Sequence, residues 1–160
     1  MYRLRSCLVS WILLGIVAGP VPADEKPKPE AKASTAFPEV SKGETHWRSK
    51  QYDQALAAFN EAVAKYPRHA PAYEGRGRVH LAQKRYDDAL ADFDKAIELQ
   101  PRFGRAFRNR GLIWRQKKDY VRALSDFEEA IRLNAKDDIA FSNRGDLNQL
   151  RKQYDHAITD

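Results

Sequence analysis

The amino-acid sequence predicts an all-α fold, a solenoid built from stacked antiparallel helix hairpins. A period of 34 residues recurs in four glycines, four tyrosines and three phenylalanines: Gly43, Gly77, Gly111, Gly145, Tyr52, Tyr86, Tyr120, Tyr154, Phe59, Phe93 and Phe127. Inside each period, apolar residues step by three and four positions, which is the spacing of one helix face. Self-similarity of this density is typical of a repeat protein whose units stack on their neighbours.

Residues 1–23 have the pattern of a secretory signal peptide. Arg3 and Arg5 form a short positive region, an apolar run covers residues 8–17, and small residues precede an expected cleavage after Ala23. The apolar run is shorter than the roughly 20 residues needed to span a bilayer. The alternative is an uncleaved anchor. Cleavage predicts an exported protein, periplasmic or secreted, with no stable membrane span.

Residues 24–35 are expected to form a disordered linker. The segment combines prolines with dense mixed charge and has almost nothing apolar to bury. We expect it to tether the repeats to the cleaved end without a structure of its own.

Charge and cysteine usage exclude several functions. The formal net charge of the chain is +6, and loss of the leader removes two arginines, so the mild excess does not indicate a nucleic-acid partner. The only cysteine, Cys7, lies in the leader. The mature chain therefore has no disulfide, thiol nucleophile or thiolate metal site. We also find no phosphate-binding loop and no convergent histidines, and predict no catalytic residue, metal or cofactor.

Each unit is predicted to contain two helices. Ala89, Phe93 and Ala96 step by four and three on the second helix, and Tyr73 and Gly77 do so on the first. A polar turn, residues 83–85, separates the two helices. Small residues such as Gly77 and Ala89 let the helix backbones approach closely, and the large aromatic residues fill the space beside them. A proline at position 101 then ends the second helix.

These residues resemble the tetratricopeptide repeat, and the resemblance covers residues 36–160. It implies a right-handed superhelix of units at 36–69, 70–103 and 104–137, with a partial unit at 138–160. Two positions depart from the family pattern: Glu39 replaces an aromatic residue and Ala135 replaces the proline. The last unit stops at Asp160, about two turns into its expected second helix.

A basic residue at position seven of a unit recurs with an aspartate sixteen residues later. The resulting pairs are Arg76 with Asp92, Arg110 with Asp126, and Arg144 with Asp160. We interpret them as ion pairs between the two helices of one hairpin, which fix their register. These arginines are therefore excluded from the predicted binding site.

The family resemblance also implies a concave groove lined by the first helix of every unit. On that face we predict seven partner-binding residues: Trp47, Arg78, Arg105, Arg108, Asn109, Arg115 and Asn143. The arginines could bind carboxylates in bidentate fashion and the asparagines could bind a peptide backbone. The predicted partner is an acidic or carboxylate-bearing segment, and the alternative is a solvated charged face.

Some family members bind a chaperone's C-terminal carboxylate through a clamp of lysine and asparagine. Asn109 fits that clamp, but Glu74 stands where a lysine is needed. We therefore do not predict this specificity.

The predicted function is a non-enzymatic scaffold or adaptor that binds a partner peptide or helix in the groove. One alternative is a structural module that self-associates through the open last repeat. Another is a terminal interaction module of a longer secretion or envelope assembly protein. Nucleic-acid binding is disfavoured because export keeps the chain away from it.

Overall fold

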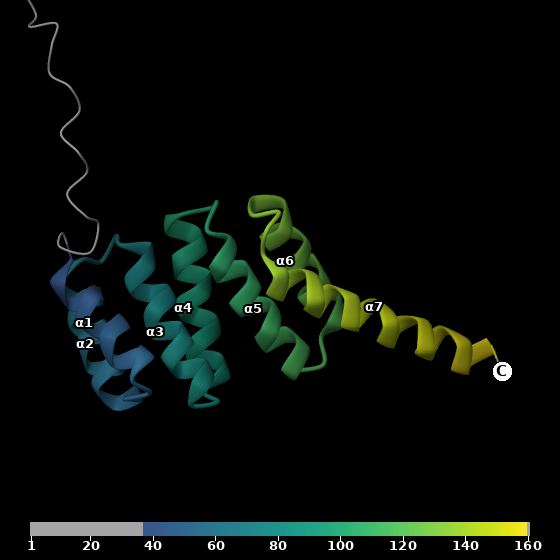
Figure 1. Cartoon of the computed structure of the whole chain (residues 1–160), viewed down its shortest axis with the longest axis horizontal. Helices are drawn as coiled ribbons and strands as arrows, with labels where there is room; N and C mark the ends of the chain where they lie inside the picture. The colour runs from purple at the N-terminus through teal and green to yellow at the C-terminus, as the bar shows by residue number, and fades with distance from the viewer. Residues whose placement is uncertain (1–36, 160) are drawn as a thin grey trace, which may run out of the picture. The chain divides into compact units, whose positions relative to one another are not determined.

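The computed structural model describes residues 37–159, with side chains up to residue 150. The predicted signal peptide (1–23) and linker (24–35) lie outside the described residues. The described part folds entirely into helices (Figure 1), with these bounds: α1 Pro38–Arg48, α2 Tyr52–Lys65, α3 Ala70–Ala82, α4 Tyr86–Leu99, α5 Gly104–Gln116, α6 Tyr120–Leu133 and α7 Asp138–Thr159. Successive helices pack on each other, and α1, α3, α5 and α7 also contact one another in sequence. The prediction of an all-α helical-repeat solenoid is confirmed.

The three complete hairpins turn at a lysine in the left-handed region. The φ angles of Lys50, Lys84 and Lys118 are 58°, 60° and 62°. After each lysine the next amide donates to a carbonyl five residues back, for example Arg85 N to His80 O at 2.8 Å. This Schellman pattern satisfies carbonyls left unpaired at the end of the first helix. Because L-residues pay a steric cost at positive φ, each lysine turn stores strain that packing must offset.

The core is made by one phenylalanine per hairpin between small residues. Phe59, Phe93 and Phe127 are fully buried. A Cβ atom added at Gly77 would lie 2.8 Å from Phe93 Cε1, closer than real carbon atoms approach. Ala89 is also fully buried. The predicted use of glycine and alanine as close-packing positions is therefore confirmed.

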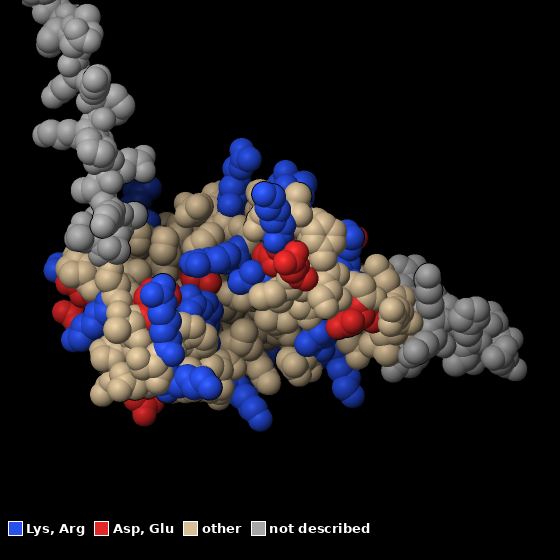
Figure 2. Space-filling view, viewed as in Figure 1, with Lys and Arg blue, Asp and Glu red and all other residues tan. Residues whose placement is uncertain are grey.

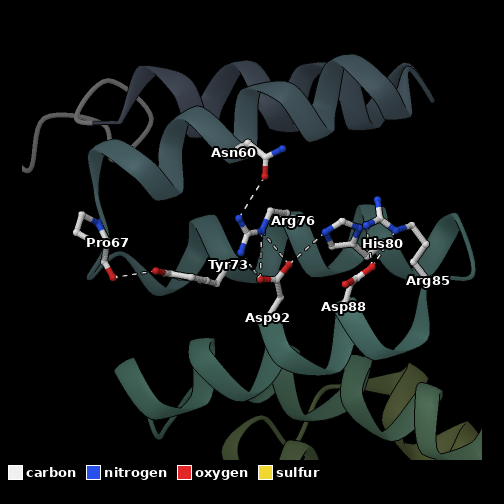
Figure 3. Close-up of polar contacts among 8 residues, drawn as sticks. All are labelled: Asn60, Pro67, Tyr73, Arg76, His80, Arg85, Asp88 and Asp92. Atoms are coloured by element: carbon white, nitrogen blue, oxygen red, sulfur yellow. Dashed lines mark hydrogen bonds and ion pairs between the residues drawn. The ribbon is translucent and has the colours of Figure 1, made fainter.

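The predicted ion pairs within hairpins are present wherever both partners are described. Arg76 Nη2 lies 2.6 Å from Asp92 Oδ1, and Arg110 Nη2 lies 2.7 Å from Asp126 Oδ1. Figure 3 shows that Arg76 also reaches back to the previous hairpin, where its Nη1 donates to Asn60 Oδ1 at 3.2 Å. The third predicted pair involves residue 160, which lies outside the described part.

Arg110 repeats this bridge one unit later. Its Nη1 lies 2.6 Å from Asp94 Oδ1 on α4, while its other nitrogens hold Asp126 on α6. One arginine therefore ties its own hairpin together and joins it to the preceding one.

The first turn of α1 compensates for the missing aromatic residue. Glu39 is buried and its Oε1 accepts a hydrogen bond from Lys65 Nζ at 2.6 Å. The pKa of Glu39 is lowered, chiefly by this bond. Phe37 stacks on the His69 ring with centroids 3.7 Å apart. An aromatic residue two positions earlier thus supplies the contact that the pattern lacks at Glu39.

The last unit differs from the hairpin that the pattern predicts. α7 runs unbroken from Asp138 to Thr159, although Lys152 occupies the place of the three turn lysines. The backbone hydrogen bonding of the first helix continues through this position instead of turning. Consistent with this, a Cβ at Gly145 would meet nothing within 4 Å.

Candidate functional site

A hollow on the face of the first helices gathers most of the predicted groove residues. It encloses about 400 Å³ and is lined by Glu44, Trp47, Glu74, Arg78, Leu81, Ala82, Arg105, Arg108 and Asn109. Five of the seven predicted residues are in this set. The other two, Arg115 and Asn143, lie outside it and bond to each other through Nη1 and Oδ1. The structure therefore brings residues from three units together on one surface, and a groove that spans several units requires such an arrangement.

The hollow is centred on a carboxylate that is almost inaccessible to solvent. The Glu74 side chain is 1% exposed. Its Oε2 accepts from Arg105 Nη2 at 3.0 Å, and its Oε1 accepts from Asn109 Nδ2 at 3.1 Å. Arg78 Nη1 lies 3.6 Å from the same Oε2. Burial raises the pKa of Glu74, and the charges of Arg105 and Arg78 oppose that rise.

A second carboxylate extends this network toward α1. Arg78 Nη1 donates to Glu44 Oε1 at 2.9 Å, and the two residues stand one repeat apart. The Arg78 guanidinium also lies over the Trp47 ring, 4.6 Å from its centroid, in a cation–π contact. Trp47 is thus held on the groove face, as predicted, by the same arginine that pairs with both glutamates.

The third and fourth units continue the pattern. Arg108 Nη1 lies 3.0 Å from Asp137 Oδ2, whose side chain is buried. Arg115 contacts Asn143 and, at 3.8 Å, Asp146. Arg78, Arg105 and Arg115 therefore each have an acceptor on a neighbouring unit, and Arg108 has one at the end of its own unit. Figure 2 shows the result on one face of the molecule, where basic side chains are interspersed with acidic ones.

The arginines of the hollow differ in their exposure to solvent. The side chain of Arg78 is 15% exposed and that of Arg108 is 19% exposed, whereas that of Arg105 is 52% exposed. Arg105 bonds Glu74 through Nη2 and its guanidinium lies 5.5 Å from the Phe103 ring centroid, while about half of its side chain is exposed to solvent. An incoming carboxylate would therefore meet Arg105 first.

A more apolar hollow adjoins the first and shares Glu44 with it. It encloses about 520 Å³ along α1 and beside the start of α3, and its lining is Phe37, Val40, Ser41, Glu44, Thr45, Arg48, His69 and Pro71. Burial lowers the pKa of His69, which favours its neutral form. The two hollows together offer a polar stretch followed by an apolar one.

Sequence reasoning missed the carboxylates that pair with the groove arginines. Glu44 and Arg78 are 34 residues apart, so they occupy equivalent positions in adjacent units, and this spacing is visible in the sequence. The burial of Glu74 and the role of Asp137 gave no such signal, because both depend on how side chains pack in three dimensions.

The described residues hold neither a metal-type cluster nor a membrane span. Over residues 37–150 no three histidine, cysteine or acidic side chains are grouped as a metal site would require. None of the helices described has the length and apolar character to cross a bilayer.

Comparison with known proteins gives a consistent result. A family model described as tetratricopeptide repeat matches residues 40–102 and 85–138. No curated protein sequence matches the chain.

Several solved structures have the same fold. The TPR domain of Arabidopsis OM64 is 23% identical with a TM-score of 0.68, and the alignment covers 69% of this chain and 92% of that one. The second TPR domain of human RPAP3, solved with the HSP70 peptide SGPTIEEVD, is 22% identical with a TM-score of 0.64, covering 69% and 92%. The TPR2B domain of yeast Sti1, solved in a pHsp70 complex, is 22% identical with a TM-score of 0.66, covering 74% and 99%.

Proposed function

We propose, from the premise that the chain belongs to the tetratricopeptide repeat family, that it is an interaction module whose groove binds a segment of another protein. The fold is typical of binding scaffolds and not of enzymes, because stacked hairpins expose an extended surface without an enclosed cleft. The observation that carries the proposal is the hollow around Glu74, which collects seven polar and aromatic side chains from three units.

The partner segment carries an acidic side chain that meets Arg105. The exposed guanidinium is suited to a carboxylate, which it can bind through two parallel hydrogen bonds. Support by analogy comes from RPAP3, whose second TPR domain was solved with a peptide that ends in Glu-Glu-Val-Asp. The neighbouring apolar hollow would receive an uncharged side chain of the same segment.

Substitution of Arg105 tests this function with a matched control. Arg85 is 50% exposed and pairs with Asp88 at the hairpin turn, away from the groove. Fluorescence anisotropy with a labelled peptide that carries one acidic side chain and an amidated C-terminus should show that Arg105→Glu weakens binding by at least about tenfold, the worth of one charge-assisted hydrogen bond. Arg85→Glu should leave the affinity unchanged. Equal affinities for wild type and Arg105→Glu would reject the groove as the acidic-segment site.

Export is part of the proposal and rests on the leader pattern alone. The mature protein would begin at Asp24 and act in the periplasm or outside the cell. N-terminal sequencing of the protein recovered from the exported fraction tests this. An intact N-terminus at Met1 in the cytoplasmic fraction would contradict it.

A second candidate function is self-association through α7. Ile139 is 53% exposed on this helix, and the space beside Gly145 is empty. The exposed Ile139 side chain could pack against a second copy. Sedimentation equilibrium over a range of concentrations separates this function from peptide binding, since Ile139→Glu would abolish a dimer without affecting the groove.

A further inference from the structure

The groove contains its own acidic ligand. Glu74 reaches from α3 into the hollow, and three donors converge on it: Arg105 at 3.0 Å, Asn109 at 3.1 Å and Arg78 at 3.6 Å. A ligand carboxylate bound at the same place would use these donors. Glu74 thus fills, from inside the chain, the position where a bound carboxylate would otherwise sit.

The charges of the hollow are balanced as a result. Each arginine of the hollow has a carboxylate partner: Arg78 pairs with Glu44, Arg105 with Glu74 and Arg108 with Asp137. The positive electrostatic potential of the groove is therefore too weak to bind several negative charges at once. Only the solvent side of Arg105 remains for an incoming anion.

Glu74 cannot easily give way to a competitor. Its side chain is 1% exposed and is held from both oxygens, so it has no solvated position to move to. A second carboxylate brought beside it would experience like-charge repulsion in a region shielded from water. This repulsion therefore weakens the binding of an acidic ligand as long as Glu74 remains in place.

We infer that Glu74 is the specificity-determining residue of the groove. It disfavours segments with clustered or terminal carboxylates and selects a segment that presents one acidic side chain to Arg105. This inference rests on the proposed function, since it concerns the selectivity of the same groove.

The test replaces Glu74 with its uncharged isostere. Glu74→Gln keeps the size of the side chain and an oxygen acceptor but removes the negative charge. Labelled SGPTIEEVD should then bind at least about tenfold tighter than to wild type. A neutral analogue, with Gln, Gln and Asn replacing the three acidic residues and an amidated C-terminus, should bind both proteins equally.

Glu39→Gln is the matched control. Glu39 is also a buried carboxylate, with a single cationic partner in Lys65, but it does not line the hollow. The affinity of Glu39→Gln for SGPTIEEVD should equal that of wild type. Glu74→Asp, which retains the charge, should not gain affinity. Circular dichroism of each variant shows that the helices are intact.

A second measurement separates this inference from the proposed function. Sulfate is titrated while the side-chain amide signal of Asn109 is followed by NMR. Glu74→Gln should show saturable sulfate binding that wild type and Glu74→Asp lack. If Glu74→Gln binds sulfate but neither protein binds SGPTIEEVD or the peptide with one acidic side chain, the role of Glu74 stands and the peptide-binding function fails. If wild type and Glu74→Gln bind peptide with equal affinity, or if neither binds peptide and sulfate does not distinguish them, the inference is overturned.

Discussion

The contact between Gly77 and Phe93 can be tested by adding one methyl group. The Cβ of Gly77→Ala would lie 2.8 Å from Phe93 Cε1, 3.1 Å from Phe93 Cδ1 and 3.1 Å from Asp92 Cβ. Phe93 is fully buried, so its ring cannot swing into solvent to relieve the overlap. The helix α3 must therefore move away from α4, which would open the core of the second hairpin.

The magnitude follows from two opposing effects. Overpacking in a filled core costs about 1–3 kcal/mol. Replacing glycine by alanine inside a helix stabilises it by about 1 kcal/mol. We expect Gly77→Ala to lower the free energy of opening of α3 and α4 by about 1 kcal/mol net.

Gly145 supplies a control at the equivalent position of the last unit. A Cβ there meets nothing within 4 Å, so only the helix-propensity gain of about 1 kcal/mol remains for Gly145→Ala. Because that gain is common to both substitutions, the difference between them isolates the steric cost against Phe93.

Amide hydrogen exchange is the appropriate assay, because it gives an opening free energy for each helix separately. Exchange in α3 should be faster in Gly77→Ala than in wild type, and exchange in α7 should be slower in Gly145→Ala. If α3 is as well protected from exchange in Gly77→Ala as in wild type, the claim that α3 and α4 leave no room for a methyl group at Gly77 is refuted.

Four further substitutions address the ion pairs, the turns and the effect of pH. Arg110→Met should cost about 3 kcal/mol in urea unfolding because it leaves the buried Asp126 carboxylate unpaired. Arg132→Met, at an exposed pair, should leave the urea midpoint close to that of wild type. Lys84→Gly should raise the urea midpoint by an amount equivalent to about 0.5–1 kcal/mol, since glycine adopts the observed φ of 60° without strain. A lowered midpoint would contradict the strain assigned to the turn. Burial lowers the pKa of His80 below its usual 6.5. Between the folded pKa and 6.5, His80 is therefore protonated in the unfolded chain and neutral in the folded chain. Protein stability is lost as the pH falls through this range. Chemical denaturation at about pH 7.5 and pH 5.5 should show a smaller loss for His80→Phe than for wild type, and an equal loss would exclude His80 as a contributor.

Much of the fold could be predicted because each structural requirement recurs in the sequence every 34 residues. This period is followed by the glycine at which two helices approach closely, by the phenylalanine that fills the core beside it, and by the arginine that pairs with an aspartate. The pair of Arg76 and Asp92 is one example: both residue types return together one unit later, and both pairs form at hydrogen-bonding distance. Periodic features were predictable because one structural unit explains them all.

The features that broke the period were not predictable in the same way. Glu39 departs from the pattern, and only the structure shows it buried with Lys65. The straight course of α7 depends on a balance between turn strain and packing, which residue spacing does not measure. For the groove, the pattern indicated which residues face it. It did not indicate that Glu74 would be buried there, because burial depends on how Arg105 and Asn109 from the next unit close over it.

The bridging arginines have a consequence for how the array comes apart. Arg110 holds Asp94 of one hairpin and Asp126 of the next, and Arg76 similarly joins Asn60 to Asp92. Detaching one hairpin therefore removes an acceptor from the guanidinium of its neighbour and weakens that neighbour's own closure. The units are thermodynamically coupled, so under a pulling force the chain would release adjoining hairpins in joint steps and not one at a time.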